Sequence, residues 1–270
     1  MTIWCDWLPR WLRLKGETII IPEGAHSILG PSSSERWMNC PGSVLAPGVA
    51  KQTEYAAEGS AAHWLSEQVR EKGLPASEWK GATLVVGDFS FKVGKTLIDS
   101  VTTFVEEVSQ IPGAALIEEM VAYEDLVPGG FGTLDDGRLE DGLCTITDYK
   151  HGQGVQVSAK DNSQMRLYAL GVWFKYRWIY DFDKFVLKIC QPRLRHFDRD
   201  EISLGRLLQW GYDTIRPAAK LALTPGAPIV AGKHCKFCKL KNTCVTRQDY
   251  KMAMRNREVN AETEFSDMSQ

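Results

Sequence analysis

Two short acidic segments near the middle of the sequence carry residue types that can bind a divalent metal ion. The first reads Gly-Thr-Leu-Asp at 132–135, and the second reads Asp-Tyr-Lys at 148–150. If the second segment is a strand, Asp148 and Lys150 lie on one face, because side chains alternate along a strand. Two carboxylates beside one lysine suit a hard cation that activates water, with the ammonium group orienting that water for attack on phosphorus. An Asp-x-Lys sequence alone is more often part of an ordinary solvated hairpin.

Three residues outside these segments extend the pattern. Gln164 and Tyr168 are four residues apart in an apolar stretch, so a helix would present both on the same side. His63, in an earlier expected helix, can add an imidazole to two carboxylates around a transition metal. A single histidine of this kind is more often packed or exposed than a ligand, so the hypothesis of a metal site depends on the order of all these motifs.

The acidic residues leave alternatives open. Asp136 directly follows Asp135, and only the Gly-Thr-x-Asp spacing favours Asp135 as the metal ligand. Glu118 or Glu119, on the preceding expected strand, either adds a carboxylate to the site or belongs to a solvated strand edge. Glu58 is typical of a first-turn helix acid that favours the helix dipole, rather than of a ligand.

A second group of residues is rich in cysteine. Cys235, Cys238 and Cys244 fall within ten positions, which indicates metal binding rather than disulfides. A closed tetrathiolate site needs a fourth ligand; Cys40 is the best candidate, and His234 can replace it in a zinc site. The spacing alone suits both zinc and an iron–sulfur cluster. The remaining cysteines are expected to be ordinary side chains, the last two of them buried in strands: Cys5, Cys144 and Cys190.

Hydrophobic periodicity predicts the elements that position these residues. An amphipathic helix over 93–108 precedes three strands, and an apolar helix and one further strand follow. The order helix, three strands, helix, strand predicts an α/β fold with flanking helices. The expected strands and helix of this core are Ala115–Tyr123, Gly132–Leu139, Leu143–Lys150, Asn162–Trp178 and Phe185–Gln191. The expected flanking elements are a helix over Ala57–Glu71, a hairpin over 83–93 and a helix over Leu204–Leu223.

Composition limits the classes of protein that fit. The chain has 32 basic and 34 acidic residues and a formal net charge of −2, unlike a general nucleic-acid coat but compatible with a local basic groove. Arg193 and Arg195 follow the last expected strand and either point toward phosphates or lie at a solvated strand end. No apolar run is long enough to span a membrane, and the first residues lack a secretion signal. We therefore expect a cytoplasmic protein, of a bacterium or a phage-infected host, with no membrane partner.

The chain divides into three expected regions. Residues 1–30 form an extension whose tryptophans are expected to dock on the core or on another subunit. Residues 31–250 are expected to form one domain that includes the cysteine cluster at 235–244. Residues 256–270 have few large apolar side chains and are expected to be a disordered tail.

In this order, the motifs resemble the RecB-like branch of the PD-(D/E)XK nuclease superfamily, over Ser32 to about Tyr250. The likeness is greatest to phage- and prophage-encoded members and to iron–sulfur nucleases of the AddB and CRISPR-adaptation type. The resemblance implies a restriction-endonuclease-like core that binds Mg²⁺ or Mn²⁺. The resemblance implies that His63, Asp135 and Asp148 bind the metal, together with the backbone carbonyl of Tyr149. It also implies that Lys150 is the catalytic lysine and that Gln164 and Tyr168 are the helix pair of this branch.

The resemblance also carries expectations about the cluster and the reaction. It implies that Cys40, together with Cys235, Cys238 and Cys244, holds a [4Fe–4S] cluster, with structural zinc as the alternative. The expected activity is that of a metal-dependent DNA exonuclease, which resects linear duplex ends in phage-type recombination. Single-stranded DNA, a single-strand annealing protein and further copies of this chain are the expected partners. The competing hypotheses are a non-catalytic DNA-binding module with a structural four-cysteine metal site and a hydrolase of small phosphoesters.

Overall fold

The computed structural model describes residues 16–22, 24–48 and 52–267. The tryptophans expected to dock, Trp4, Trp7 and Trp11, lie outside the described residues, as does Cys5.

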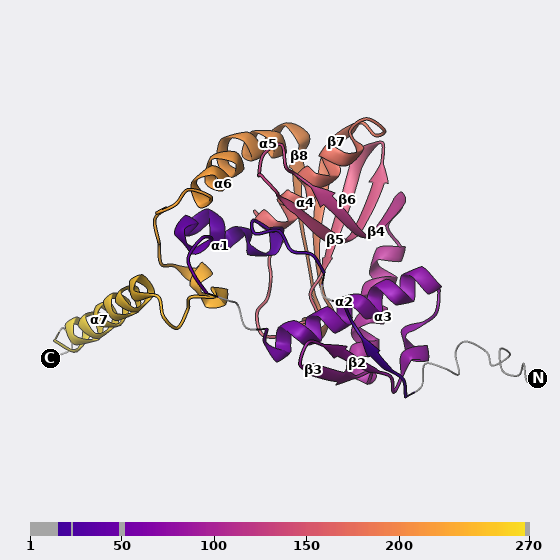
Figure 1. Cartoon of the computed structure of the whole chain (residues 1–270), viewed down its shortest axis with the longest axis horizontal. Helices are drawn as coiled ribbons and strands as arrows, with labels where there is room; N and C mark the ends of the chain where they lie inside the picture. Colours follow the sequence, from indigo (N-terminus) through magenta and orange to yellow (C-terminus); the bar gives the residue numbers. More distant parts are fainter. Residues whose placement is uncertain (1–15, 23, 49–51, 268–270) are drawn as a thin grey trace, which may run out of the picture.

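A five-stranded sheet with the strand order β4-β5-β6-β7-β8 forms the centre of the molecule (Figure 1). The first three strands form an antiparallel meander, and β6 and β7 run parallel. A parallel pair needs a crossover, and helix α4 (Ser163–Tyr176) supplies it. Preceded by α3 (Lys95–Ser109), these elements confirm the expected order of helix, three strands, helix and strand. The strands are β4 (Ala114–Ala122), β5 (Phe131–Glu140), β6 (Gly142–Tyr149), β7 (Phe182–Gln191) and β8 (His196–Ser203).

Strand β8 is not predicted by the sequence pattern. It pairs antiparallel with β7 at the edge of the sheet, and its residues alternate between exposed and half-buried until Ile202. An edge strand has one neighbour and covers little of the core, so it carries few apolar residues and many charges. The hydrophobic pattern that predicts the central strands is therefore weak here.

A smaller sheet packs with two helices beside the first. Strand β1 (Thr18–Ile20) pairs parallel with β2 (Thr83–Val86), which forms the expected hairpin with β3 (Phe89–Lys92). Helix α2 (Glu54–Lys72) begins after Thr53, whose side chain accepts from the Ala56 amide, and ends at Gly73 in the left-handed conformation. The buried side chains of α2, α3 and this hairpin form one apolar cluster, which Tyr149 and Cys190 join from the ends of β6 and β7. Helix α2 is thereby held against the strand ends that carry the acidic motifs.

The larger apolar cluster lies between the five-stranded sheet and the helices on its other side. These helices are α1 (Ser34–Asn39), α4, α5 (Leu204–Trp210) and α6 (Arg216–Ala222). The single helix expected over 204–223 is interrupted by a π-helical turn, Gly211–Ile215. A Cβ at Gly211 would lie 2.8 Å from Leu126 Cδ1, so glycine allows the close packing of this turn.

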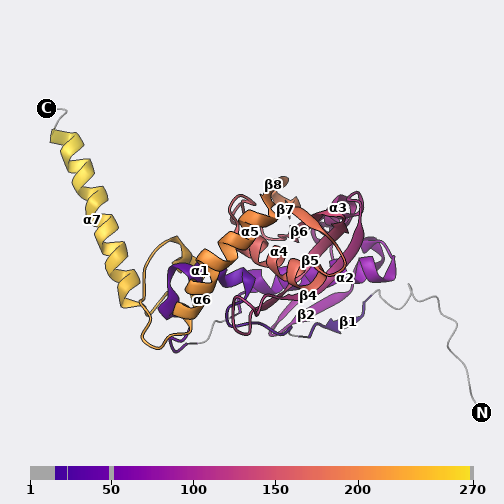
Figure 2. The ribbon, with the colours of Figure 1, turned by 90° about the horizontal axis from the view of Figure 1, so that it is seen from above.

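The C-terminal segment leaves the body of the molecule. A short 3₁₀ helix, η7 (Lys233–Phe237), follows α6, and α7 (Val245–Asp267) then projects away from the sheets (Figures 1 and 2). Helix α7 occupies the region where we expected a short helix and then a disordered tail from residue 256. The stretch has neither glycine nor proline and is rich in alanine, methionine, glutamate and arginine, which favour helix even without apolar burial. Among the described helices, none has the length and apolar character needed to cross a bilayer.

Candidate metal centre

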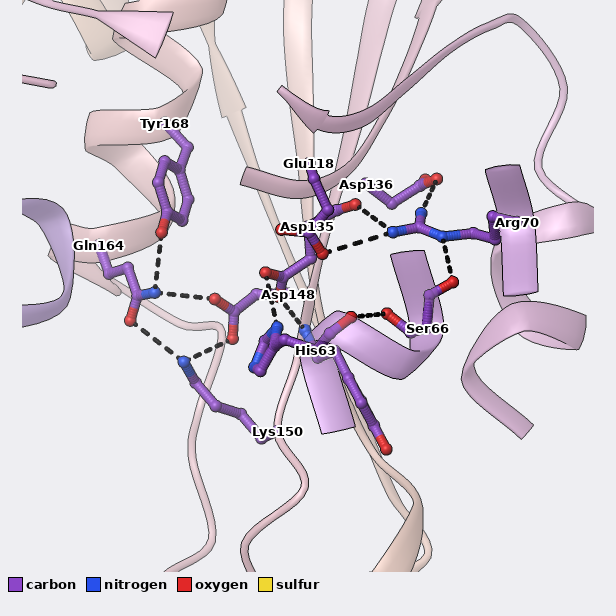
Figure 3. A network of polar contacts seen from close by, with 11 residues as sticks. His63, Ser66, Arg70, Glu118, Asp135, Asp136, Asp148, Lys150, Gln164 and Tyr168 are labelled. Atoms are coloured by element: carbon purple, nitrogen blue, oxygen red, sulfur yellow. Dashed lines mark hydrogen bonds and ion pairs between the residues drawn. The ribbon is translucent and has the colours of Figure 1, made fainter. Parts of the chain in front are cut away.

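Helix α2 and the adjoining strands β4 and β5 bring three potential metal ligands together (Figure 3). His63 lies in the middle of α2, Glu118 on β4 and Asp135 on β5. One ligand atom from each lies within 4.8 Å of the others, and His63 Nδ1 is 3.0 Å from Asp135 Oδ1. One imidazole and two carboxylates suit Mn²⁺ and, with added water ligands, Mg²⁺.

Glu118 faces the site because the pairing of β4 with β5 is interrupted there. Ile117 pairs with Asp136 and Glu119 with Leu134, which leaves Glu118 opposite Asp135. Glu118 has a φ of 47°, a left-handed conformation that typically costs about 1–3 kcal/mol outside glycine. Its Oε1 is buried without a hydrogen-bond partner, and Arg70 Nη2 is 3.6 Å away. A carboxylate oxygen that is buried, strained and unsatisfied fits the place of a metal ligand.

Glu119, the alternative to Glu118, points elsewhere. Its carboxylate forms an ion pair with Lys175 and accepts a hydrogen bond of 3.2 Å from the Tyr176 hydroxyl. The choice that the sequence left open between these two glutamates is therefore decided by geometry in favour of Glu118.

Backbone and side-chain contacts fix the position of Asp135. The Tyr149 amide donates to Asp135 Oδ2 at 2.6 Å, and Arg70 Nη2 donates to the Asp135 carbonyl at 2.8 Å. Asp136 lies on the opposite side of β5, where it accepts from Arg70 Nη1 at 3.2 Å and from Arg138 Nη2 at 2.9 Å. Asp135 and not Asp136 therefore faces His63.

The remaining predicted residues form a second polar chain next to these ligands. Lys150 Nζ lies 2.8 Å from Asp148 Oδ2, and Gln164 Nε2 donates to Asp148 Oδ1 at 2.8 Å. Gln164 also bridges to Lys150 Nζ at 3.4 Å and to the Tyr168 hydroxyl at 3.3 Å. A Cβ at Gly132 would lie 2.5 Å from Pro31 Cγ and 3.1 Å from Tyr168 Cε1, which explains the glycine of the Gly-Thr-x-Asp motif.

The expected ligand set and the observed group differ in one member. We expected His63, Asp135 and Asp148 to share the metal; the mutually close group contains His63, Asp135 and Glu118, and coordination by Asp148 stays a prediction. Asp148 is buried beside this group and paired with Lys150. Both carboxylates have a cation nearby, Lys150 for Asp148 and Arg70 for Glu118, and each has one buried oxygen without a hydrogen-bond partner. Coordination by the Tyr149 carbonyl stays a prediction.

Burial and neighbouring charges set the protonation of the centre. Burial lowers the pKa of His63, but the carboxylates of Asp135 and Glu118 outweigh it and raise that pKa to about 9. Burial, together with the charge of Asp135, raises the pKa of Glu118 to about 8. Burial acts against ionisation of Asp135, yet His63 holds its pKa below the usual value. A cation that binds here near neutral pH must therefore displace protons from His63 and Glu118.

The same physical causes keep Lys150 charged. Burial lowers the pKa of Lys150, but Asp148 and Asp135 raise it above the ordinary lysine value. Burial is also the main cause that raises the pKa of Asp148, against the attraction of Lys150. Lys150 thus presents an ammonium group at the edge of the centre.

The sequence hypothesis did not include several residues that hold the ligands in place. Ser66 and Arg70 follow His63 at helical spacing on the same side of α2, and Arg70 reaches Asp135, Asp136 and Glu118. Their spacing of three and seven residues from His63 is the feature of the sequence that could have identified them. Behind the site, the Tyr149 hydroxyl lies 2.7 Å from Ser100 Oγ.

Glu58 and Arg193 also have roles that differ from those expected. Arg193 Nη1 lies 3.2 Å from Glu58 Oε1 and 3.1 Å from His151 Nε2, and His151 Nδ1 contacts the Tyr149 hydroxyl at 3.2 Å. Glu58 is thus not just a helix-dipole acid; it ties the start of α2 to the turn after β7. Arg193 is bound within the protein rather than free for phosphates.

The four expected cluster cysteines line one small cavity at the start of the C-terminal segment. Backbone amides donate toward three of the sulfur atoms: Val230 to Cys40 at 3.3 Å, Gly232 to Cys235 at 3.4 Å and Leu240 to Cys238 at 3.4 Å. Such bonds stabilise thiolates at metal and iron–sulfur sites. Cys144 and Cys190 are buried in strands, as expected.

Four thiols around one cavity suit both zinc and an iron–sulfur cluster, so the choice between the two stays a prediction. His234 is held elsewhere, with Nε2 2.9 Å from the Val230 carbonyl.

The fold and site together define an α/β protein with a candidate divalent-metal centre between α2 and the middle of β4 and β5, and with a separate group of four cysteines. A family model described as "Protein of unknown function (DUF2800)" matches residues 26–270, and the chain belongs to this family. A solved structure titled "Crystal structure of SSO0001" is similar at a TM-score of 0.40 and 14% identity, covering 84% of this chain and 89% of that chain.

Proposed function

We propose that the protein is a metal-dependent nuclease that hydrolyses phosphodiester bonds in DNA. The observation that supports this most is the group formed by His63, Glu118 and Asp135, which lies beside the ammonium group of Lys150. Three ligands for a divalent cation, next to a fixed positive charge, match the needs of an attack by water on a phosphodiester.

In this proposal each side chain has a distinct task. His63, Glu118 and Asp135 would hold Mg²⁺ or Mn²⁺, which lowers the pKa of a bound water and polarises the phosphate. Lys150 orients the attacking water and offsets the negative charge that develops on the phosphate oxygens. Asp148 and Gln164 fix the ammonium group through the contacts of 2.8 Å and 3.4 Å. Arg70 fixes the backbone of Asp135 from behind.

The choice of DNA, and of duplex ends in particular, rests on the resemblance to RecB-like PD-(D/E)XK nucleases. We include in the proposal the restriction-endonuclease-like assignment of the core and the role of Gln164 and Tyr168 as its helix pair. We also propose that Cys40, Cys235, Cys238 and Cys244 hold a structural [4Fe–4S] cluster. The amide-to-sulfur bonds and the cavity that the four cysteines share support a metal site here, and the preference for iron–sulfur over zinc rests on the resemblance.

The experiment that tests the proposal compares four substrates with the full chain and a titration of Mg²⁺ or Mn²⁺. These are end-labelled linear duplex, closed circular duplex, linear single strand and bis(p-nitrophenyl) phosphate. We expect metal-dependent cleavage of the linear DNAs and slow hydrolysis of the small ester, both lost in Glu118→Gln. The matched control is Glu119→Gln, which changes the adjacent glutamate that points away from the site.

Two outcomes would contradict the proposal. Hydrolysis of the small ester without cleavage of any DNA would identify a hydrolase of small phosphoesters. Binding of DNA without cleavage of any of the four substrates, under all metal conditions, would identify a non-catalytic DNA-binding module.

A further inference from the structure

The segment from η7 into α7 has a charge unlike that of the chain as a whole. Between residues 233 and 256 Asp249 is the sole acidic residue, although the whole chain has a formal net charge of −2. The basic residues of this segment are Lys233, Lys236, Lys239, Lys241, Arg247, Lys251 and Arg255. We call residues 233–256 the basic arm.

Most of these cations face solvent. Lys233, Lys236, Lys241, Lys251 and Arg255 are exposed. Among the side chains that the structure describes, which end at residue 256, no carboxylate forms an ion pair with any of the seven cations. Elsewhere on the surface, cations such as Lys95, Lys184 and Arg199 do pair with acids. The basic arm therefore has positive charge available for an anionic partner.

Within α7 the cations form a stripe. Arg247, Lys251 and Arg255 follow one another at intervals of four residues, which places them on one side of the helix, about 6 Å apart along its axis. Like charges at this spacing destabilise a helix, and a cation in the first turn, such as Arg247, is opposed by the helix dipole. An extended anion running along the stripe would relieve both effects.

Aromatic rings interrupt the positive surface. Phe237 lies between Cys235 and Cys238 with 78% of its surface exposed, and Lys236 Nζ is 5.5 Å from its ring centroid. Tyr250, in α7, is 44% exposed. Exposed rings among lysines are the combination with which proteins bind single-stranded nucleic acid, since bases stack on the rings and cations contact the phosphates.

The basic arm is connected to the candidate metal centre through α1. Lys239 Nζ, in the arm, donates to the Val44 carbonyl at 3.2 Å, a few residues after the end of α1, which joins the arm to that helix. At the other end of α1, Ser34 Oγ lies 2.6 Å from Ser163 Oγ, the residue before Gln164. Figure 1 shows α1 between the base of α7 and helix α4. A nucleic-acid strand bound to the arm can therefore run past α1 toward the side of the metal centre that carries Gln164 and Lys150.

We propose that the basic arm binds single-stranded nucleic acid, with bases stacked on Phe237 and Tyr250 and phosphates contacted by the α7 stripe. This inference rests on the proposed function, because it names the surface that holds the strand of the same substrate. An anionic membrane surface would also attract cations, and it is treated as an outcome of the test.

The test measures binding apart from catalysis. Fluorescence anisotropy with the full chain in EDTA follows a labelled single strand and the corresponding duplex across a range of salt concentrations. The double variant Lys251→Gln/Arg255→Gln is compared with Lys80→Gln/Lys92→Gln, which removes two lysines that are also exposed. We expect about a 10-fold loss of single-strand affinity in the arm variant, and its salt slope should fall by about 1.4, at about 0.7 per lost phosphate contact.

Substitutions at Phe237 separate stacking from simple apolar contact. Phe237→Leu should lose about 5- to 10-fold in single-strand affinity, whereas Phe237→Trp should keep it, because only an aromatic ring stacks on a base. Unchanged single-strand affinity in both the arm variant and Phe237→Leu would overturn the proposal. So would binding to phosphatidylserine vesicles that depends on the arm, with no effect of the arm on nucleic-acid affinity.

The two proposals fail in different ways. Hydrolysis of bis(p-nitrophenyl) phosphate reports on the metal centre and does not involve the arm, so we expect the arm variants to retain it. If the wild-type protein hydrolyses none of the substrates but still binds single strands through the arm, only the nuclease proposal is rejected. If DNA cleavage is normal but the arm variants bind single strands as tightly as the wild type, only the proposal for the arm is rejected.

Discussion

Replacing Glu118 with glutamine should change both the affinity of the centre for Mn²⁺ and the number of protons that binding releases. In the metal-free protein the pKa of His63 is about 9 and that of Glu118 about 8. Because metal ligands must be deprotonated, Mn²⁺ binding at pH 7 should release about two protons, and affinity should rise with pH up to about 9. Holding these two protons at pH 7 weakens metal binding by about 10³-fold, or about 4 kcal/mol, relative to the deprotonated site.

Glutamine at position 118 has no proton to release and offers a neutral oxygen. The Glu118→Gln variant should therefore bind Mn²⁺ more weakly above pH 8, release about one proton at pH 7, and show about half the wild-type dependence of log affinity on pH. Titration calorimetry in buffers of different ionisation enthalpy measures both affinity and proton release. The adjacent Glu119→Gln should match the wild type, because Glu119 is paired with Lys175 outside the site. Equal affinity and equal proton release in wild type and Glu118→Gln would refute the assignment of Glu118 as a ligand.

Three further predictions concern the lysine, the cluster and its packing. Lys150→Ala should lower kcat by ~10²-fold or more and leave Mn²⁺ and DNA affinity nearly unchanged, as single-turnover cleavage and anisotropy can check; wild-type turnover would remove Lys150 from the mechanism. Protein purified without oxygen should be brown and contain iron and sulfide in near-equal amounts. A colourless preparation with one tightly bound zinc would favour the zinc alternative. If the Cys40→Ser variant is as stable as the wild type, Cys40 is not a ligand in either kind of site. Gly42→Ala should lower the iron content and Tm together, since its Cβ would lie 2.3 Å from the Ala227 carbonyl oxygen; an unchanged iron content would show that this contact does not support the cluster.

The sequence predicted the parts of the site that depend on regular structure. Asp148 and Lys150 share a face because strands alternate, and Gln164 and Tyr168 share one because helices repeat, so their spacing sufficed. Glu118 could not be separated from Glu119, because the deciding feature is the left-handed backbone at Glu118, which interrupts that alternation. Neither residue type nor spacing signals a non-glycine residue in this conformation.

Long-range polar contacts were also beyond the reach of periodicity. The Glu58 to Arg193 ion pair joins residues 135 positions apart, and both side chains are compatible with ordinary surface positions when each is considered alone. Strand β8 was missed for a related reason, since an edge strand rich in charge lacks the apolar alternation of its neighbours. Hydrophobic periodicity was enough to predict the fold class, whereas these contacts depend on which elements become neighbours in the folded protein.

The seating of Cys40 against residues 230–244 has a consequence for how the protein is made. The polypeptide must be extended by 204 residues after Cys40 before Cys244 exists. At 5–20 residues per second, this interval lasts about 10–40 s. Throughout it the Cys40 thiol lacks its partner residues while the sheets form, and the proposed iron–sulfur cluster, which needs all four sulfurs, can be inserted only afterwards. Loading of the cysteine site would then be a late event of biogenesis, and cells that make the chain faster than they supply the cofactor should accumulate folded sheets with an open C-terminal segment.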